Sequence, residues 1–270
     1  MWPDRHRNVV SDSLGAVLGA SGPGLRAVDV TVAFGGVQAL TAVSVTATPG
    51  AVTGLIGPNG AGKTTLFNVL TGLQRADRGR VELNGQTVTG WSPHRRARLG
   101  LARTFQRLEL FWSLSVADNV RVAAESALRW WDVPARLRGT QPVVDDATVG
   151  RLLERVGLVG LADRPADRLP TGQARLVELA RALALGPSVL LLDEPGSGLD
   201  DGEAAVLGRV LRSLADQGMA VMLVEHDMAL VMQACSSVIV LDGGRVLAEG
   251  TPDAIQRHPA VQAAYLGAAP

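Results

Sequence analysis

Two alternating runs of apolar and polar residues occupy residues 25–47. The first places Val28, Val30 and Val32 on one face, and the second places Val43, Val45 and Ala47 on one face. Gly35 and Gly36 lie between the runs, where a reversal of the chain needs glycine. This pattern predicts an antiparallel pair of β-strands.

Further along the chain, short apolar runs have the length of buried strands and alternate with helical patterns. The runs cover residues 52–56, 189–192, 220–224 and 238–241. Helical spacing follows residue 63 up to Gly72, and is expected from residue 173 to about 185, over about 204–215 and from Met228. Asn84-Gly85 is typical of a hairpin turn. Strands alternating with helices predict the α/β class, with a mainly parallel sheet covered on both faces.

Residues 91–168 differ from this alternation. They are rich in Arg, Ala and Leu at helical spacing, show no clear strand, and contain a looser Pro/Gly stretch at 133–144. We therefore expect a helical subdomain inserted at about 91–170 within one domain covering 25–270. Residues 1–24 are expected to form a flexible N-terminal tail, and about 250–270 a C-terminal tail.

Composition narrows the functional classes. The 270 residues carry 26 basic and 26 acidic side chains, so net charge gives no reason to bind nucleic acid. The cluster of Arg95, Arg96, Arg98 and Arg103 lacks interleaved aromatic residues, which favours a solvated helix face or an acidic partner loop over nucleic acid. A single cysteine cannot form an internal disulfide, and no apolar run reaches the roughly 20 residues of a membrane span.

A glycine-rich segment follows the strand expected at 52–56. It reads Gly57-Pro58-Asn59-Gly60-Ala61-Gly62-Lys63-Thr64-Thr65 and fits the pattern GxxxxGK[ST]. The glycines let backbone N–H groups surround phosphate oxygens, Lys63 reaches the β- and γ-phosphates, and the Thr64 hydroxyl ligates Mg²⁺. Lys63 is the only lysine in the chain. The segment, called the phosphate loop below, predicts binding of a nucleoside triphosphate.

Two carboxylates end the apolar run at 189–192. Asp193 and Glu194 stand at the carboxyl end of a buried strand, where α/β sheets present their ligands. Asp193 is suited to hold Mg²⁺ and Glu194 to polarise an attacking water molecule. A solvated strand end is the alternative reading, which the upstream phosphate loop makes less favourable.

With these motifs in place, the chain resembles the ATP-binding subunits of ABC transporters. The resemblance covers about residues 25–267, and the family's motifs appear in order. They are the phosphate loop, a Q-loop (Arg103-Thr-Phe-Gln106), a signature segment (Leu169-Pro-Thr-Gly-Gln173), the acidic strand end, a D-loop (Ser197-Gly-Leu-Asp200) and a switch histidine, His226. The implied fold is a P-loop NTPase core of ABC ATPase type, with an antiparallel β subdomain and an inserted helical subdomain.

The resemblance also implies roles for single residues. Glu194, His226 and Gln106 are the catalytic candidates, and Thr64, Gln106 and Asp193 are the candidate ligands of Mg²⁺. Phe34 resembles the aromatic residue that stacks on adenine, although ordinary core packing is an alternative for it. Pro170, Thr171, Gly172, Gln173 and Asp200 are expected to contact the ATP held by a second subunit, so that two subunits clamp two ATP molecules.

The signature segment departs from the family pattern, which has serine where this chain has Pro170. Proline suits the first turn of a helix, but the hydroxyl and one N–H are lost. A hydrogen bond to a charged phosphate contributes about 1.5–3 kcal/mol. The loss corresponds to roughly a tenfold to hundredfold weaker clamp on the partner's ATP, unless the Thr171 hydroxyl replaces it.

Finer resemblance links residues 101–120 and 248–267 to the ATP-binding proteins of branched-chain amino acid importers. It implies transmembrane permease subunits, a second ABC ATPase subunit and, indirectly, a solute-binding protein as partners. The expected location is peripheral, at the cytoplasmic face of the cell membrane. The solute is expected to be a branched-chain or other hydrophobic amino acid, or a small amide. Alternatives are a weakly hydrolysing regulatory subunit in a heterodimer, because of Pro170, and a soluble ABC ATPase of DNA repair or translation.

Overall fold

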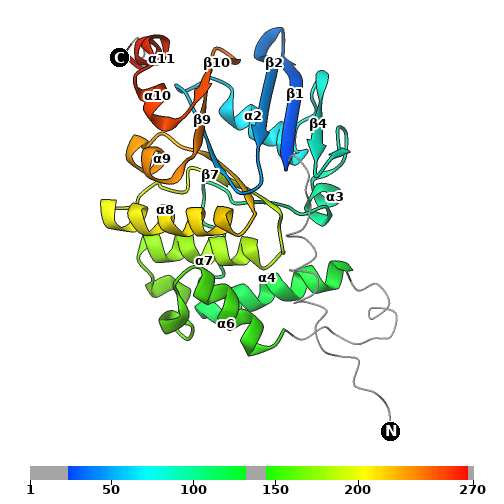
Figure 1. The fold of residues 1–270 in the computed structure, drawn as a ribbon. Helices are drawn as coiled ribbons and strands as arrows, with labels where there is room; N and C mark the ends of the chain where they lie inside the picture. The colour runs from blue at the N-terminus through cyan, green and yellow to red at the C-terminus, as the bar shows by residue number, and fades with distance from the viewer. Residues whose placement is uncertain (1–23, 132–143, 267–270) are drawn as a thin grey trace.

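The computed structural model describes residues 24–131 and 144–266. Residues 1–23 of the expected N-terminal tail, most of the expected loose stretch and residues 267–270 lie outside the described residues. Figure 1 shows two β-sheets with helices on either side and a separate group of helices at one end of the molecule.

The smaller sheet is antiparallel and contains the two strands expected at 25–47. Its order is β2-β1-β4-β5. Its strands are β1 (Leu25–Phe34), β2 (Val37–Ala47), β4 (Arg78–Leu83) and β5 (Gln86–Thr87). Asn84 and Gly85 form the turn between β4 and β5, both with positive φ, as the hairpin signal predicted.

The alternation predicted for β1 is interrupted by a β-bulge. The pairing of β1 with β2 shifts between Ala27 and Val30, and Asp29 has φ 51°. A bulge moves the following side chains to the other face. Val30 and Val32 are therefore fully buried, whereas Val28 is only partly buried, and the prediction that all three share one face was wrong. In β2, Val43, Val45 and Ala47 are buried as predicted.

The larger sheet has the order β10-β9-β3-β8-β7-β6. Its strands are β3 (Val52–Ile56), β6 (Leu101–Arg103), β7 (Val189–Asp193), β8 (Ala220–Val224), β9 (Ser237–Asp242) and β10 (Arg245–Gly250). All neighbours pair in parallel except β10, which is antiparallel to β9. The mainly parallel sheet predicted from the sequence is confirmed.

Strand β6 corrects the expectation that residues 91–168 contain no strand. It pairs with β7 at the sheet edge, with Leu101 opposite Val189. Three residues are too few to show a period, so only the pairing with β7 reveals them as a strand. The helical insertion therefore begins after Arg103.

The helices fall into three groups. Helices α2 (Lys63–Thr71) and α3 (Pro93–Arg98) lie near the antiparallel sheet, and α8 (Asp201–Asp216), α9 (Met228–Ala234), α10 (Pro252–Gln256) and α11 (Pro259–Leu266) follow later strands. The helical subdomain contains α4 (Val116–Trp131), α6 (Asp146–Arg155), two short 3₁₀ turns (Val159–Leu161, Ala166–Arg168) and α7 (Thr171–Leu183). In Figure 1, α4 and α6 lie at the end of the molecule opposite β1 and β2.

Alternate residues of β7 face two different hydrophobic cores. Leu190 and Leu192 pack into a core shared with the helical subdomain, α8 and α9, whereas Val189 and Leu191 pack into a core shared with α2 and the antiparallel sheet. A strand buried on both faces reads as a continuous apolar run, which explains the pattern at 189–192. The carboxyl ends of β3 and β7 are thereby fixed at one edge of the sheet. No helix within the described residues is both long and apolar enough to cross a bilayer.

Candidate functional site

The phosphate loop runs from the end of β3 into α2, as predicted. Gly57 has φ 150°, and a Cβ there would lie 2.1 Å from the Leu241 carbonyl oxygen. Gly62 is the N-cap of α2 with φ 102°, and its Cβ would lie 2.7 Å from the Ala39 carbonyl oxygen. Only glycine fits these two positions. The loop therefore keeps a backbone path that directs N–H groups and the helix N-terminus toward an anion.

Lys63 points into this loop. Its Nζ donates to the carbonyl oxygens of Gly57 at 2.6 Å and Pro58 at 3.0 Å. Burial lowers the pKa of the Lys63 amine, and the charge of Glu194 opposes that shift. The ammonium group is thus held between the glycine cradle and the acidic strand end, where it can meet phosphate oxygens.

Glu194 lies next to Gln106, the end of the Q-loop. Nε2 of Gln106 donates to Oε2 of Glu194 at 2.6 Å, so the structure brings together two of the three catalytic candidates. Glu194 has φ 49°, a conformation that costs a non-glycine residue about 1–3 kcal/mol. Its backbone N–H donates to the Val224 carbonyl at 3.0 Å, which anchors this strained residue to β8.

Asp193 forms an ion pair that the sequence did not reveal. Nη2 of Arg103 lies 2.7 Å from Oδ2 of Asp193, and both side chains are largely buried. Nη1 of Arg103 donates to Oδ1 of Asn68 on α2 at 2.8 Å. Arg103 thus ties the start of the Q-loop to the proposed metal ligand, and it is no part of a solvated helix face. Ninety residues separate Arg103 from Asp193, so no local pattern could have paired them.

His226 follows β8, with its side chain 66% exposed, and the buried carboxylate of Glu225 organises its backbone. Glu225 accepts from the N–H groups of Gly196 at 2.6 Å, His226 at 3.1 Å and Asp227 at 3.3 Å. Burial raises the pKa of the Glu225 carboxyl group, and these bonds oppose the shift. Glu225 connects the turn after Glu194 to the switch histidine, a role that sequence reasoning missed.

The Q-loop backbone is held by Arg175 of α7. Nη2 of Arg175 donates to the Gln106 carbonyl at 2.8 Å, and its guanidinium pairs with Glu178 at 3.4 Å. Burial raises the pKa of the Glu178 carboxyl group. Because α7 begins in the signature segment, Arg175 connects the helix of that segment to Gln106. The only sequence signal that pointed to this role of Arg175 was its position two residues after the signature segment.

Helix α7 begins within the signature segment, at Thr171. It therefore starts one residue after Pro170, which was expected to lie in the first turn. Pro170 is the N-cap rather than a residue of the first turn, with ψ 156° and no side-chain capping bond. Its carbonyl accepts the first helical hydrogen bond, from Ala174 at 3.0 Å. The contacts of Gly172 are made with α8 and not with the phosphate loop.

The remaining candidates differ in their surroundings. Asp200 is the N-cap of α8, where it accepts from the Glu203 N–H at 2.8 Å. Phe34 is half exposed at the end of β1, which removes core packing as the explanation for it. Burial raises the pKa of the phenol of Tyr265 on α11, a residue that the sequence did not single out, and the nearby backbone of Gly57 opposes that shift. The C-terminal segment therefore reaches the phosphate loop.

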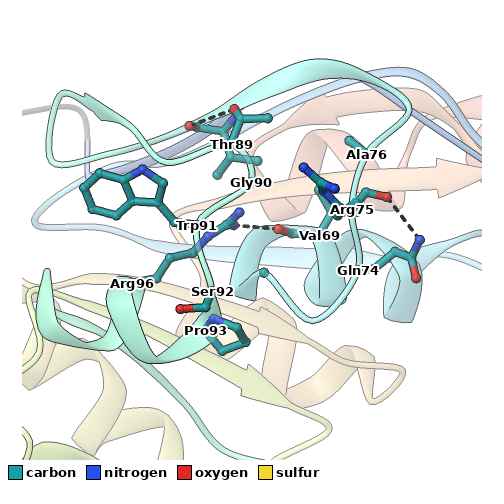
Figure 2. A pocket seen from close by; sticks show the side chains of 12 residues that line it. Val69, Gln74, Arg75, Ala76, Thr89, Gly90, Trp91, Ser92, Pro93 and Arg96 are labelled. Carbon is teal, nitrogen blue, oxygen red and sulfur yellow. Dashed lines mark hydrogen bonds between the residues drawn. The ribbon is translucent and has the colours of Figure 1, made fainter.

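A separate cavity of about 440 Å³ lies between the C-terminal end of α2 and the segment leading into α3. Figure 2 shows Trp91 and Arg75 at this cavity, with Arg96 between Trp91 and Val69. Arg96 is buried, and its Nη1 donates to the carbonyl oxygens of Val69 and Leu70 at 2.6 and 2.7 Å. Arg96 therefore caps α2 instead of facing solvent, so the expected solvated helix face is wrong for Arg96, whereas Arg95 and Arg98 of α3 are exposed as expected. Burial lowers its pKa to about 10.

The side chains present are suited to magnesium. Thr64 is exposed on the first turn of α2. The ion pair with Arg103 uses Oδ2 of Asp193, and the bond to Glu194 uses Nε2 of Gln106. Neither interaction uses Oδ1 of Asp193 or the amide oxygen of Gln106. Hydroxyl, carboxylate and amide oxygens are ligands that Mg²⁺ prefers when phosphate and water complete its shell. Among the described residues, no cluster of three His, Cys, Asp or Glu side chains could hold a metal ion without such help.

Comparison with known proteins gives consistent matches. The family model for ABC transporter matches residues 40–197, and the model for branched-chain amino acid ATP-binding cassette transporter matches residues 245–270. The chain is 38% identical over 256 residues to the high-affinity branched-chain amino acid transport ATP-binding protein BraF of Pseudomonas aeruginosa, covering 92% of this chain and 100% of BraF. It is 38% identical over 243 residues to LivG of Escherichia coli K12, named for the same transport, covering 87% of this chain and 94% of LivG.

Among solved structures, the ADP conformation of MJ1267, an ATP-binding cassette of an ABC transporter, superposes with a TM-score of 0.78 at 30% identity. The match covers 90% of this chain and 98% of MJ1267. The ABC transporter model alone spans more than half of the chain, and the order of motifs, the phosphate loop and the Gln106–Glu194 pair agree with it. The chain therefore belongs to the ABC transporter family, as an ATP-binding subunit that hydrolyses ATP.

Proposed function

We propose that this chain powers the uptake of branched-chain or other small hydrophobic amino acids through transmembrane permease subunits. The observation that carries the proposal is the 38% identity to BraF, a branched-chain amino acid transport protein, over the whole length of BraF. The C-terminal match at residues 245–270 supports the same sub-family independently of the nucleotide site. The regulatory-subunit alternative is not favoured, because no observation besides Pro170 supports it.

In the proposed reaction, the Glu194 carboxylate accepts a hydrogen bond from the water molecule that attacks the γ-phosphate. Gln106 fixes the Glu194 carboxylate at 2.6 Å, so the base is oriented before the reaction. Lys63 and the N-terminus of α2 stabilise the charge on the transferring phosphoryl group. Bound Mg²⁺ would supply further charge neutralisation, with Thr64, Asp193 and Gln106 as its protein ligands.

His226 is proposed to contact the γ-phosphate and orient the same water. The support is its exposed side chain on a turn that Glu225 ties to Gly196, two residues after Glu194. The signature segment (170–173) and Asp200 are proposed to meet the ATP of a second ABC ATPase subunit, and Phe34 to stack on adenine. Closure of the dimer on ATP, followed by opening after hydrolysis, would then move the permease subunits.

The proposal is tested with the assembled complex in lipid vesicles, supplied with a solute-binding protein and ATP. We expect ATP-dependent uptake of radiolabelled leucine, isoleucine or valine, with uptake and turnover both lost in Glu194→Gln. An exposed acid far from the site, Glu154 on α6, gives the matched control Glu154→Gln, which keeps full activity. ATP hydrolysis that drives no amino acid uptake, but drives uptake of a small amide, would overturn the choice of substrate. ATP turnover that is absent in the wild-type complex would overturn the proposal as a whole.

A further inference from the structure

The carboxylate of Glu203 connects the N-termini of two helices. Its Oε1 accepts from the Gly172 N–H of α7 at 3.2 Å, and its Oε2 accepts from the Asp200 N–H of α8 at 3.2 Å. Asp200 in turn accepts from the Glu203 N–H at 2.8 Å. The second and third bonds form a capping box that belongs to α8 alone. The bond to Gly172 is additional and spans 31 residues.

The approach of Glu203 to α7 depends on glycine at position 172. A Cβ on Gly172 would lie 2.4 Å from both Cδ and Oε1 of Glu203. Any larger residue would push the carboxylate away from the start of α7. The contact is therefore made at the backbone of the signature segment itself.

This contact changes what the N-terminus of α7 offers to an anion. Four N–H groups at a helix start normally lack helical partners. At this helix, Pro170 has no N–H, and the Gly172 N–H is already bonded to a carboxylate. The N–H groups of Thr171 and Gln173 remain in the first turn. A fixed negative charge beside them opposes the partial positive charge of the helix end.

We propose that Glu203 is a positioning residue that holds the signature segment against α8 and competes with the γ-phosphate presented by a second ATP-loaded subunit. The inference rests on the proposed function, in which residues 170–173 face that phosphate. Dimer closure then requires the phosphate to attract the start of α7 more strongly than Glu203 repels it. Glu203 thereby raises the ATP concentration at which two subunits close, in addition to any effect of Pro170.

The test compares Glu203→Gln with the wild type in the assembled complex, measuring KM for ATP and kcat separately. The amide is isosteric and neutral, and its oxygen can still accept from Gly172. We expect KM to fall about two- to fivefold, the range set by a charge at a helix terminus, with kcat little changed. Asp201→Asn removes the same charge from the exposed first turn of α8 and should leave KM unchanged.

A second measurement separates competition from a purely structural role. ATP affinity of the isolated chain depends on its own phosphate loop and should be the same in Glu203→Gln and the wild type. ATP-driven dimerisation in a Glu194→Gln background should need less ATP when Glu203→Gln is added. Should Glu203→Gln lower the melting temperature markedly, both measurements are made at a temperature well below the melting temperature of the variant, where it is folded. An unchanged or higher KM in a folded variant, with the wild type active, overturns this inference and leaves the proposed function standing.

Discussion

Nε2 of Gln106 donates to Oε2 of Glu194 at 2.6 Å, across 88 residues of sequence. Gln106 belongs to a loop whose backbone is held by Arg175 of α7, and Glu194 to the end of β7. The bond therefore joins the proposed catalytic base to the helix that begins in the signature segment. Only Gln106 stands between Arg175 of α7 and Glu194 in this chain of hydrogen bonds.

Replacing Glu194 with Gln should reduce ATP turnover by about 100-fold or more, since a positioned general base contributes about 10²–10⁴-fold. The amide oxygen can still accept from Gln106, so the fold and ATP binding should be preserved. Phosphate release from the assembled complex measures the loss, and equilibrium binding of a fluorescent ATP analogue measures what is retained. Turnover within a factor of three of the wild type would exclude Glu194 as the base.

Replacing Arg103 with Met should lower the free energy of unfolding by about 3–5 kcal/mol, because it leaves Asp193 as an unpaired and largely buried charge. The exposed pair of Arg80 and Glu82 provides the matched control. Arg80→Met should cost no more than about 1 kcal/mol. Urea unfolding of the isolated chain measures both variants, and equal effects of the two substitutions would contradict the burial argument.

The Lys63→Met variant should lose ATP hydrolysis and gain stability in nucleotide-free buffer at pH 7, where the wild type keeps a half-buried ammonium group. Burial lowers the pKa of Lys63 below 10.5, so between the two values the unfolded chain binds more protons than the folded chain. Wild-type stability must then rise with pH in that window.

The variant lacks this titration, so its stability advantage should shrink as the pH approaches 10.5. Thermal melts of both proteins at pH 7 and pH 10 test the sign. An advantage that grows with pH would show that hydrogen bonds to Gly57 and Pro58 outweigh desolvation.

Changing Pro170 to Ser should act on two measurable quantities. Position 170 is an N-cap without a side-chain bond, and a serine there is expected to stabilise α7 by about 0.5–2 kcal/mol. In the assembled complex the restored hydroxyl and N–H should raise turnover at the partner's ATP site, up to about tenfold or more. Pro170→Ala removes the proline without adding a cap and separates the two causes. Unchanged turnover in Pro170→Ser would mean that Thr171 already supplies the missing hydroxyl.

The local sequence was sufficient for the phosphate loop, the acidic end of β7 and most strands of the larger sheet. Glycine spacing, one lysine and runs of apolar residues are short-range signals, because each reflects the conformation of fewer than ten neighbouring residues. The same signals failed at β1, where the bulge at Asp29 turned Val28 away from the core, and at β6, whose three residues become a strand only beside β7.

The tertiary structure alone decided how the candidate residues are held. Arg103 reaches Asp193, Glu225 reaches Gly196, and Glu203 reaches Gly172, over 90, 29 and 31 residues. In the sequence, Arg103, Glu225 and Glu203 look like ordinary surface residues. Buried ion pairs, and carboxylates that accept from backbone N–H groups, leave no periodic pattern and no fixed spacing in a sequence. The sequence determines which side chains are able to perform the chemistry. The packing of β6, α7 and α8 determines which of these side chains contact one another. The physical reason is that a charge buried in a low-dielectric interior must be paired.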